Sequence, residues 1–241
     1  MRKVFVATPC YDGRIDVWYA NSLFQTQKLA AEHQVEITPI WMSYDALVQR
    51  ARNDLIAMAL ETGHDDIIFI DHDIEWEPQW FYQLLNYPVD VVGGTYRRKS
   101  DSEISYVAKI NDPLSVVPDP VTGLLPVAGL GTGFMRISRQ AMTALWDSSR
   151  PYTETDKNKH RRWIFDVIVD EHGELVSEDI TVCNKLKQLG FDLWLASHMT
   201  CNHVGNKKYT GNFATWFSEM TARAPTPPAV KQSPSVRSLY L

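Results

Sequence analysis

The chain has 241 residues, of which 44% are hydrophobic, so it can bury a sizeable core and is neither a disordered nor a fibrous sequence. The 24 Lys and Arg against 29 Asp and Glu give a formal net charge of −5, which excludes a whole-surface attraction to nucleic acid or anionic lipid. Three cysteines without a Cys-x-x-Cys pair argue against a disulfide framework or a zinc ribbon. The apolar run 4–7 is too short for a signal peptide, and no stretch of about 18 apolar residues predicts a membrane span. We therefore expect a cytoplasmic protein.

Strands and helices alternate along the first hundred residues. Helical spacing of apolar residues predicts helices at 17–32, from Ser43 or Asp45 to about 62, and after Pro78. Short apolar runs predict strands at 4–7, 35–41, 67–70 and 89–92. The run at 67–70 consists of four consecutive apolar residues, which is typical of a strand covered on both faces. The alternation predicts an α/β fold with a mostly parallel central sheet flanked by helices.

The second half of the chain is less regular. Residues 104–133 are rich in Pro, Gly and short β-branched runs, and we expect short strands and loops there. The elements expected further on are a strand at 133–137, a helix from Ser138 to about 146, a hairpin within 162–176 that turns at 171–173, a helix at 178–189 capped by Ser177, and a last core strand at 191–196. We expect one domain over residues 1–222 and a flexible Pro-rich tail over residues 223–241.

Two aspartates directly follow the buried strand at 67–70. Ligands of open α/β sheets bind beyond the carboxyl ends of the strands, and Asp71 and Asp73 lie at such an end. Residues i and i+2 share a side of extended backbone, so both carboxylates can reach one hard divalent cation whose other positions are taken by phosphate oxygens. His72 should point the opposite way. The sequence therefore predicts a metal–diphosphate site, the alternative being a solvated acidic loop.

The strand followed by Asp71-His72-Asp73 resembles the Asp-x-Asp signature of the GT-A-fold glycosyltransferases, which bind a nucleotide sugar through a divalent metal. The other segments that match this family in order are 51–53 (Ala-Arg-Asn), 92–96 (Val-Gly-Gly-Thr-Tyr), 131–134 (Gly-Thr-Gly-Phe), 177–179 (Ser-Glu-Asp) and 201–205 (Cys-Asn-His-Val-Gly). The resemblance covers about residues 3–210. It is closest to small stand-alone glycosyltransferases of bacteriophages and large viruses, and so implies a location in the host cytoplasm. It further implies a GT-A-like domain with a small hairpin and loop region for the acceptor.

The resemblance also implies roles for particular residues. Asp71, Asp73 and His203 would hold Mn²⁺ or Mg²⁺, although a lone His is often a satisfied core or interface residue. Asp179 would be the general base of an inverting transfer, deprotonating the acceptor hydroxyl, with Glu178 as the nearest substitute. Because acidic residues favour the positive end of a helix dipole, a structural interpretation of this Glu-Asp pair stays open. In a retaining enzyme the assignment would fail.

The resemblance also implies that the segment after the first strand holds the base and ribose of the donor, a UDP- or GDP-sugar. Tyr11 could stack on the base and Asp12 could accept from a ribose hydroxyl or a base nitrogen, although Asp12 and Gly13 also fit a turn. Arg52 could reach the diphosphate or belong to an ordinary charged helix face. Gly133, like Gly131, could let backbone approach the sugar or make the bend before a strand. The full set expected to contact the donor is Thr8, Pro9, Tyr11, Asp12, Arg52, Asn53, Asp71, His72, Asp73, Gly94 and Gly133.

The densest basic cluster runs from Lys157 to Trp163, and Lys207 and Lys208 could add to it. Such a run is usually a solvated loop. The alternative is contact with a polyanionic acceptor at Lys157 to Arg162, because Arg and Lys bind phosphates and Trp163 can stack on a base or a sugar face. A glycan, a protein or a modified DNA base therefore remains open as the acceptor.

The leading hypothesis is a metal-dependent glycosyltransferase that moves a sugar from a nucleoside-diphosphate sugar to an acceptor hydroxyl. A phage-type DNA glycosyltransferase acting on a hydroxylated base is the first alternative. A nucleotidyltransferase also uses paired aspartates and a metal, but it should carry a Gly-rich basic loop after the first strand, whereas residues 8–13 are acidic and contain one Gly. The 8 Trp and 10 Tyr keep a non-catalytic carbohydrate-binding module open.

Overall fold

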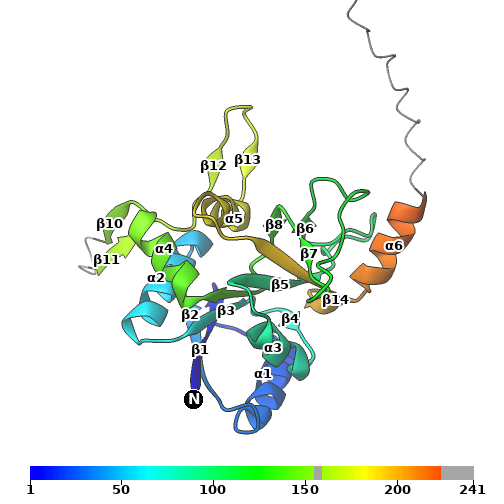
Figure 1. The fold of residues 1–241 in the computed structure, drawn as a ribbon. Helices are drawn as coiled ribbons and strands as arrows, with labels where there is room; N and C mark the ends of the chain where they lie inside the picture. Colours follow the sequence, from blue (N-terminus) through cyan, green and yellow to red (C-terminus); the bar gives the residue numbers. More distant parts are fainter. Residues whose placement is uncertain (155–158, 224–241) are drawn as a thin grey trace, which may run out of the picture.

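The computed structural model describes residues 1–154 and 159–223. Its centre is a nine-stranded sheet with helices on both faces (Figure 1). β1 is parallel to both β2 and β3, β9 is antiparallel to both β3 and β5, and β5 is parallel to β14. The strands of its main path, in chain order, are β1 (Arg2–Cys10), β2 (Val35–Ser43), β3 (Asp66–Ile70), β5 (Val91–Tyr96), β9 (Phe134–Ser138), β14 (Leu193–Val204) and β15 (Lys208–Tyr209). The predicted α/β architecture with a mostly parallel sheet is confirmed, while the reversed direction of β9 was not predicted.

Two apolar layers cover the sheet, because successive strand residues point to opposite faces. On one face Val4 and Val6 of β1 pack in a core with α1 (Val17–Leu29) and α3 (Pro78–Asn86). On the other face the core contains Phe5 and Ala7 together with residues of the remaining helices. Those helices are α2 (Val48–Glu61), α4 (Arg139–Ser148), α5 (Glu178–Gln188) and α6 (Phe213–Arg223). Strand β3 is buried throughout, as its apolar run predicted.

The helix starts show where local signals were sufficient. α4 begins where predicted, and the Ser138 hydroxyl accepts a hydrogen bond from the Ala141 backbone N–H at 3.2 Å. α2 begins later than predicted, because Asp45 lies in the preceding loop, where it accepts from the Leu47 N–H and pairs with Arg50 of the first turn of α2. α6 was not predicted; it packs Phe213 against the ring of Tyr106.

The rest of the chain forms short strands. β4 (Ile74–Glu75) and β7 (Leu125–Pro126) pair with β14, and β6 (Ala108–Lys109) pairs with β8 (Gly129–Leu130). Outside the main sheet, β10 (Pro151–Glu154) pairs antiparallel with β11 (Lys159–Arg162), and β12 (Ile168–Val169) forms a hairpin with β13 (Leu175–Val176). The β12–β13 hairpin extends away from the sheet (Figure 1) and turns at the predicted position, where Gly173 has φ +80°. Arg162 belongs to β11 rather than to this hairpin.

Two sequence-based predictions concern the chain as a whole. Residue 223 ends α6, and the rest of the predicted tail, residues 224–241, lies outside the described residues. Within residues 1–154 and 159–223, no helix is both long enough and apolar enough to cross a bilayer.

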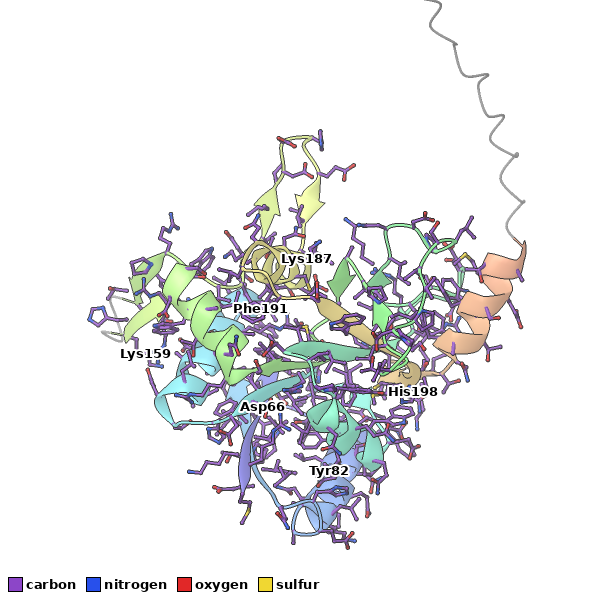
Figure 2. The ribbon with its side chains drawn as sticks, in the orientation of Figure 1. Asp66, Tyr82, Lys159, Lys187, Phe191 and His198 are labelled. Atoms are coloured by element: carbon purple, nitrogen blue, oxygen red, sulfur yellow. The ribbon has the colours of Figure 1, made fainter. Side chains whose placement is uncertain are left out.

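A buried ion pair joins β3 to β9. Asp66, labelled within the sheet in Figure 2, is 1% exposed, and its Oδ1 accepts from Nε of Arg136 at 2.7 Å. The other carboxylate oxygen accepts from Arg2 at 2.5 Å. Arg136 also donates to the backbone carbonyls of Val89 and Tyr87, at 2.6 and 3.3 Å, and so connects the α3–β5 loop to the sheet.

Replacing Arg136 with leucine is expected to lower the free energy of unfolding by about 3–5 kcal/mol, because Asp66 stays buried after losing one of its two cationic partners. Urea unfolding followed by circular dichroism measures this loss. The control is Arg14→Leu, since the Arg14 side chain is 85% exposed and its nearest carboxylate oxygen is 3.9 Å away. That variant should change the free energy by less than about 0.5 kcal/mol. Equal stabilities for the two variants would contradict the prediction.

Candidate functional site

A cavity of about 220 Å³ lies at the carboxyl ends of β1, β2 and β3, and we call it the aspartate cavity. It is lined by Pro9, Cys10, Tyr11, Met42, Asp45, Val48, Ala51, Arg52, Asp71, His72, Asp73 and His203. The structure thus brings Asp71 and Asp73 together with His203, a residue from the far end of the sequence. It also places the 68% exposed Tyr11 at the same cavity.

Arg52 connects the first aspartate to α5. Its Nη2 donates to Oδ1 of Asp71 at 2.9 Å, and its Nη1 pairs with Oε1 of Glu178. Burial by itself would lower the pKa of Arg52, but the carboxylates of Asp71 and Glu178 outweigh it and raise that pKa. Arg52 is therefore a fixed cation that bridges two carboxylates.

The second aspartate has a different cation beside it. Nζ of Lys99 lies 2.5 Å from Oδ2 of Asp73, and Nε2 of His203 lies 3.6 Å from Oδ1. Burial tends to raise the pKa of Asp73, but its interactions with His203 and Lys99 lower that pKa to about 2. Asp73 is therefore ionised at neutral pH. Sequence analysis missed Lys99; its only sequence signal is a place in the loop after the carboxyl end of a core strand.

The chemistry of these side chains suits a divalent metal. Nδ1 of His203 lies 3.0 Å from the backbone carbonyl oxygen of Arg97, which can only accept, so Nδ1 carries a proton. Nε2 is then the nitrogen able to bind a metal, and a carbonyl on the other nitrogen is the usual support of a metal-binding His. Two carboxylates and one imidazole suit Mn²⁺ better than Mg²⁺. Within the described ranges, however, no three His, Cys, Asp or Glu side chains form a ready metal-ligand group. Arg52 and Lys99 instead hold the two carboxylates in ion pairs.

The side chains of Thr8 and Asn53, two predicted donor-binding residues, form hydrogen bonds inside the fold. The Thr8 hydroxyl lies 2.6 Å from the Tyr19 hydroxyl, and both residues are buried. The Asn53 carboxamide oxygen accepts from the backbone N–H groups of Ile164 and Phe165 at 3.1 and 2.7 Å. Asn53 is 0% exposed and therefore holds that loop against α2 in place of the predicted donor contact.

Asp12 and Gly94, two more of the predicted donor contacts, also lie outside the lining of the aspartate cavity. Asp12 accepts from the Arg14 backbone N–H at 3.1 Å, which favours the turn interpretation of this segment. Gly94 is buried in β5, where an added Cβ would lie 2.7 Å from the carbonyl oxygen of Met199. Close strand packing thus explains the glycine.

Gly131 and Gly133 make room for the buried ring of Tyr96. An added Cβ at either position would lie 2.6 Å from the Tyr96 hydroxyl oxygen. That oxygen accepts from the Gly133 backbone N–H at 3.1 Å, and the Tyr96 ring contacts the His203 ring edge-on with centroids 5.0 Å apart. The glycines therefore support a tyrosine that packs on the candidate metal ligand, which differs from the predicted approach of backbone to sugar.

Asp179 lies at a second cavity of about 390 Å³, which we call the Asp179 cavity. Its carboxylate accepts from the Ser177 hydroxyl and from the Ile180 backbone N–H, so Ser177 binds this side chain and makes no side-chain cap for α5. Glu178, the adjacent residue, pairs with Arg52 instead. The remaining lining residues are Arg98, Val107, Ala108, Lys109, Ile110, Gly129, Leu130, Gly131, Ser177 and Ile180.

The glycine loop 131–133 contacts residues of both cavities. Gly131 lines the Asp179 cavity, and the carbonyl oxygen of Gly133 accepts from the Asp71 backbone N–H at 3.2 Å.

Ion pairs within the fold engage much of the basic cluster. Arg161 donates to Asp54 at 2.8 Å and to Glu61 at 3.1 Å, and Lys159, labelled at the edge of the molecule in Figure 2, lies 3.4 Å from Asp54. Lys208 pairs with Glu75 at 2.7 Å, and Lys207 pairs with Asp101. Residues 157 and 158 lie outside the described residues. These pairs favour the structural interpretation of the cluster over contact with a polyanion.

Fold and site together define an α/β protein whose central sheet is compatible with a Rossmann-like fold and whose strand ends carry a carboxylate-rich cavity. The sequence matches no model of a known protein family and no curated protein. Among solved structures, A197 from STIV is similar over 85% of this chain and 86% of that chain, with a TM-score of 0.55 and 19% identity. This likeness shows a shared fold.

A second solved structure is described as a glycosyltransferase involved in the glycosylation of the major capsid of PBCV-1. It aligns with 59% of this chain and 63% of that chain, with a TM-score of 0.34 and 10% identity. At this TM-score it adds nothing to the assignment of the fold.

Proposed function

We propose that the protein is a metal-dependent glycosyltransferase that moves a sugar from a nucleoside-diphosphate sugar to an acceptor hydroxyl with inversion. The observation that carries the proposal is the aspartate cavity, where Asp71 and Asp73 follow a core strand and are joined by His203 and Arg52. The exposed ring of Tyr11 beside them suits stacking on a nucleobase.

Charge balance at the aspartate cavity supports metal dependence. Two cations, Arg52 and Lys99, are paired with three carboxylates, those of Asp71, Asp73 and Glu178. The excess negative charge of this group disfavours an anionic diphosphate unless further positive charge is added. Asp71, Asp73 and His203 would hold Mn²⁺ or Mg²⁺, which when bound supplies a Lewis acid that neutralises the diphosphate leaving group.

The two cavities would separate the donor from the acceptor. In an inverting displacement the acceptor attacks the anomeric carbon from the side opposite the diphosphate, and the Asp179 cavity lies across the glycine loop 131–133 from the aspartate cavity. Asp179 would take the proton of the acceptor hydroxyl. The hydroxyl oxygen of the acceptor would then bond to the anomeric carbon while the bond between that carbon and the diphosphate oxygen breaks. Glu178 would hold Arg52 in place rather than act as the base.

The proposal is tested by incubating the full chain with a panel of UDP- and GDP-sugars in Mn²⁺ and measuring release of free nucleoside diphosphate. We expect release from one donor, its loss with EDTA and its recovery when Mn²⁺ is added back. A nucleotidyltransferase would instead consume a nucleoside triphosphate and release pyrophosphate, and a binding module would turn over neither. If no nucleotide sugar is bound or cleaved in Mn²⁺ or Mg²⁺, the proposal is wrong.

A further inference from the structure

Lys99 is a cation on a neighbouring loop that pairs with Asp73, one of the residues lining the aspartate cavity. The loop follows β5 and is closed at its base by a β-bridge between Arg97 and Tyr106 and by a 2.9 Å hydrogen bond from the Arg98 N–H to the Ser105 carbonyl. The Lys99 stem packs near Gly205, and its ammonium lies 2.5 Å from Oδ2 of Asp73.

Lys99 and a metal compete for the same carboxylate. Oδ1 of Asp73 faces His203, and Oδ2 is occupied by the Lys99 ammonium. Full coordination of a divalent cation by both carboxylate oxygens of Asp73 therefore requires Lys99 to leave.

Arg52 and Lys99 differ in their freedom to move. Arg52 is 4% exposed and bridges Asp71 and Glu178, so its movement away would leave both carboxylates without this cation. The Lys99 side chain is 35% exposed, and among residues 1–154 and 159–223 its one ion pair is with Asp73. A four-carbon stem with a terminal ammonium can turn from one anion to another at small cost.

We propose that Lys99 is a donor-phosphate-binding residue, which pairs with Asp73 and moves to the donor diphosphate once Asp73 coordinates a divalent metal. The inference rests on the proposed function, since it takes a nucleoside diphosphate as the ligand. A lysine released beside a diphosphate is a typical phosphate contact. Lys99 thus opposes metal binding by Asp73 and supports donor binding after the metal is bound.

This dual role gives Lys99→Met two effects of opposite sign. Without nucleotide, the affinity for Mn²⁺ should rise about tenfold, because Asp73 no longer has to release a cation. With saturating Mn²⁺, the affinity for UDP or GDP should fall about tenfold, because one phosphate contact is lost. A purely structural role for Lys99 would move neither affinity in this pattern.

The experiment uses the full chain and two titrations. Mn²⁺ alone is titrated and followed by the electron paramagnetic resonance of the free ion, and UDP and GDP are then titrated by calorimetry in saturating Mn²⁺. Lys99→Arg keeps the charge and should retain nucleotide affinity within about threefold. Lys28→Met is the matched control, because Lys28 lies over Phe24 on α1 and outside both cavities, and it should change neither affinity.

A rise in Mn²⁺ affinity together with a fall in nucleotide affinity supports the proposal. Either change without the other, or two changes of the same sign, overturns it while leaving the metal site in place. If neither the wild-type chain nor Lys99→Met binds Mn²⁺ with or without nucleotide, the metal-dependent function fails along with the inference.

Discussion

Replacement of Asp73 by asparagine is expected to reduce Mn²⁺-dependent release of nucleoside diphosphate by about 10³-fold or more. A divalent metal held by Asp73 would supply several kcal/mol of charge stabilisation to the leaving group, and every 1.4 kcal/mol corresponds to a factor of about ten in rate. An amide has no negative charge with which to hold the cation, whereas Asp73 is ionised at neutral pH because its pKa is lowered to about 2. Steady-state assays with the donor identified in the panel, in excess Mn²⁺, measure the loss.

Glu75→Gln is the matched control for this prediction. Glu75 lies in β4, two residues after Asp73, and pairs with Lys208 much as Asp73 pairs with Lys99, yet it does not line the aspartate cavity. Its replacement should change the rate less than about threefold, as expected for a partly exposed ion pair. If Asp73→Asn and Glu75→Gln lose activity equally, Asp73 has no special role with the metal. If Asp73→Asn keeps EDTA-sensitive activity, other ligands hold the cation.

The second large effect is expected at Asp179. Asp179→Asn should lower kcat by about 10²- to 10⁴-fold, the usual contribution of a general base. The donor affinity in Mn²⁺ should stay within about threefold of wild type, because the Asp179 carboxylate lies at the other cavity and pairs with no residue of the aspartate cavity. Donor hydrolysis is a valid assay, since water as the acceptor also loses a proton. Calorimetric titration of the donor separates affinity from rate.

Glu178→Gln provides the contrast to Asp179→Asn. Because Glu178 pairs with Arg52, and Arg52 with Asp71, this variant should weaken donor binding along with the rate. A variant Asp179→Asn that binds donor normally and keeps full activity would remove the base assignment. Glu178 would then be the next carboxylate to test.

The ion pairs of the basic cluster bear on where the acceptor binds. Arg161 and Lys159 pair with Asp54 and Glu61, so their positive charge is largely balanced and attracts a nucleic acid only weakly. The acceptor surface is instead expected beside Asp179, where Arg98 and Lys109 also line the cavity. Screening glycan, protein and modified-DNA acceptors against the identified donor tests this expectation.

The sequence by itself determined the α/β architecture and the strand end that carries the two aspartates. Periodicity and strand burial are local properties: four consecutive apolar residues before Asp71 already predict a strand covered on both faces, and the structure confirms it. The same holds for α4, whose start depends on a Ser138 hydroxyl three residues from its partner. The match of segment order also placed His203 at the cavity, although nothing in its own neighbourhood distinguishes it from a core histidine.

Only the tertiary structure decided which charged groups are partners. Arg52 and Asn53 are adjacent on α2, yet the first reaches Asp71 and the second holds a loop around Phe165. Glu178 meets Arg52 across 126 residues of sequence, and Lys99 meets Asp73 across 26. Such pairings depend on the order of the strands in the sheet and on the path of the loops between them. A change of one residue in strand register turns a side chain to the opposite face. Local patterns therefore identified the carboxylates of the site, while long-range packing selected the cations that hold them.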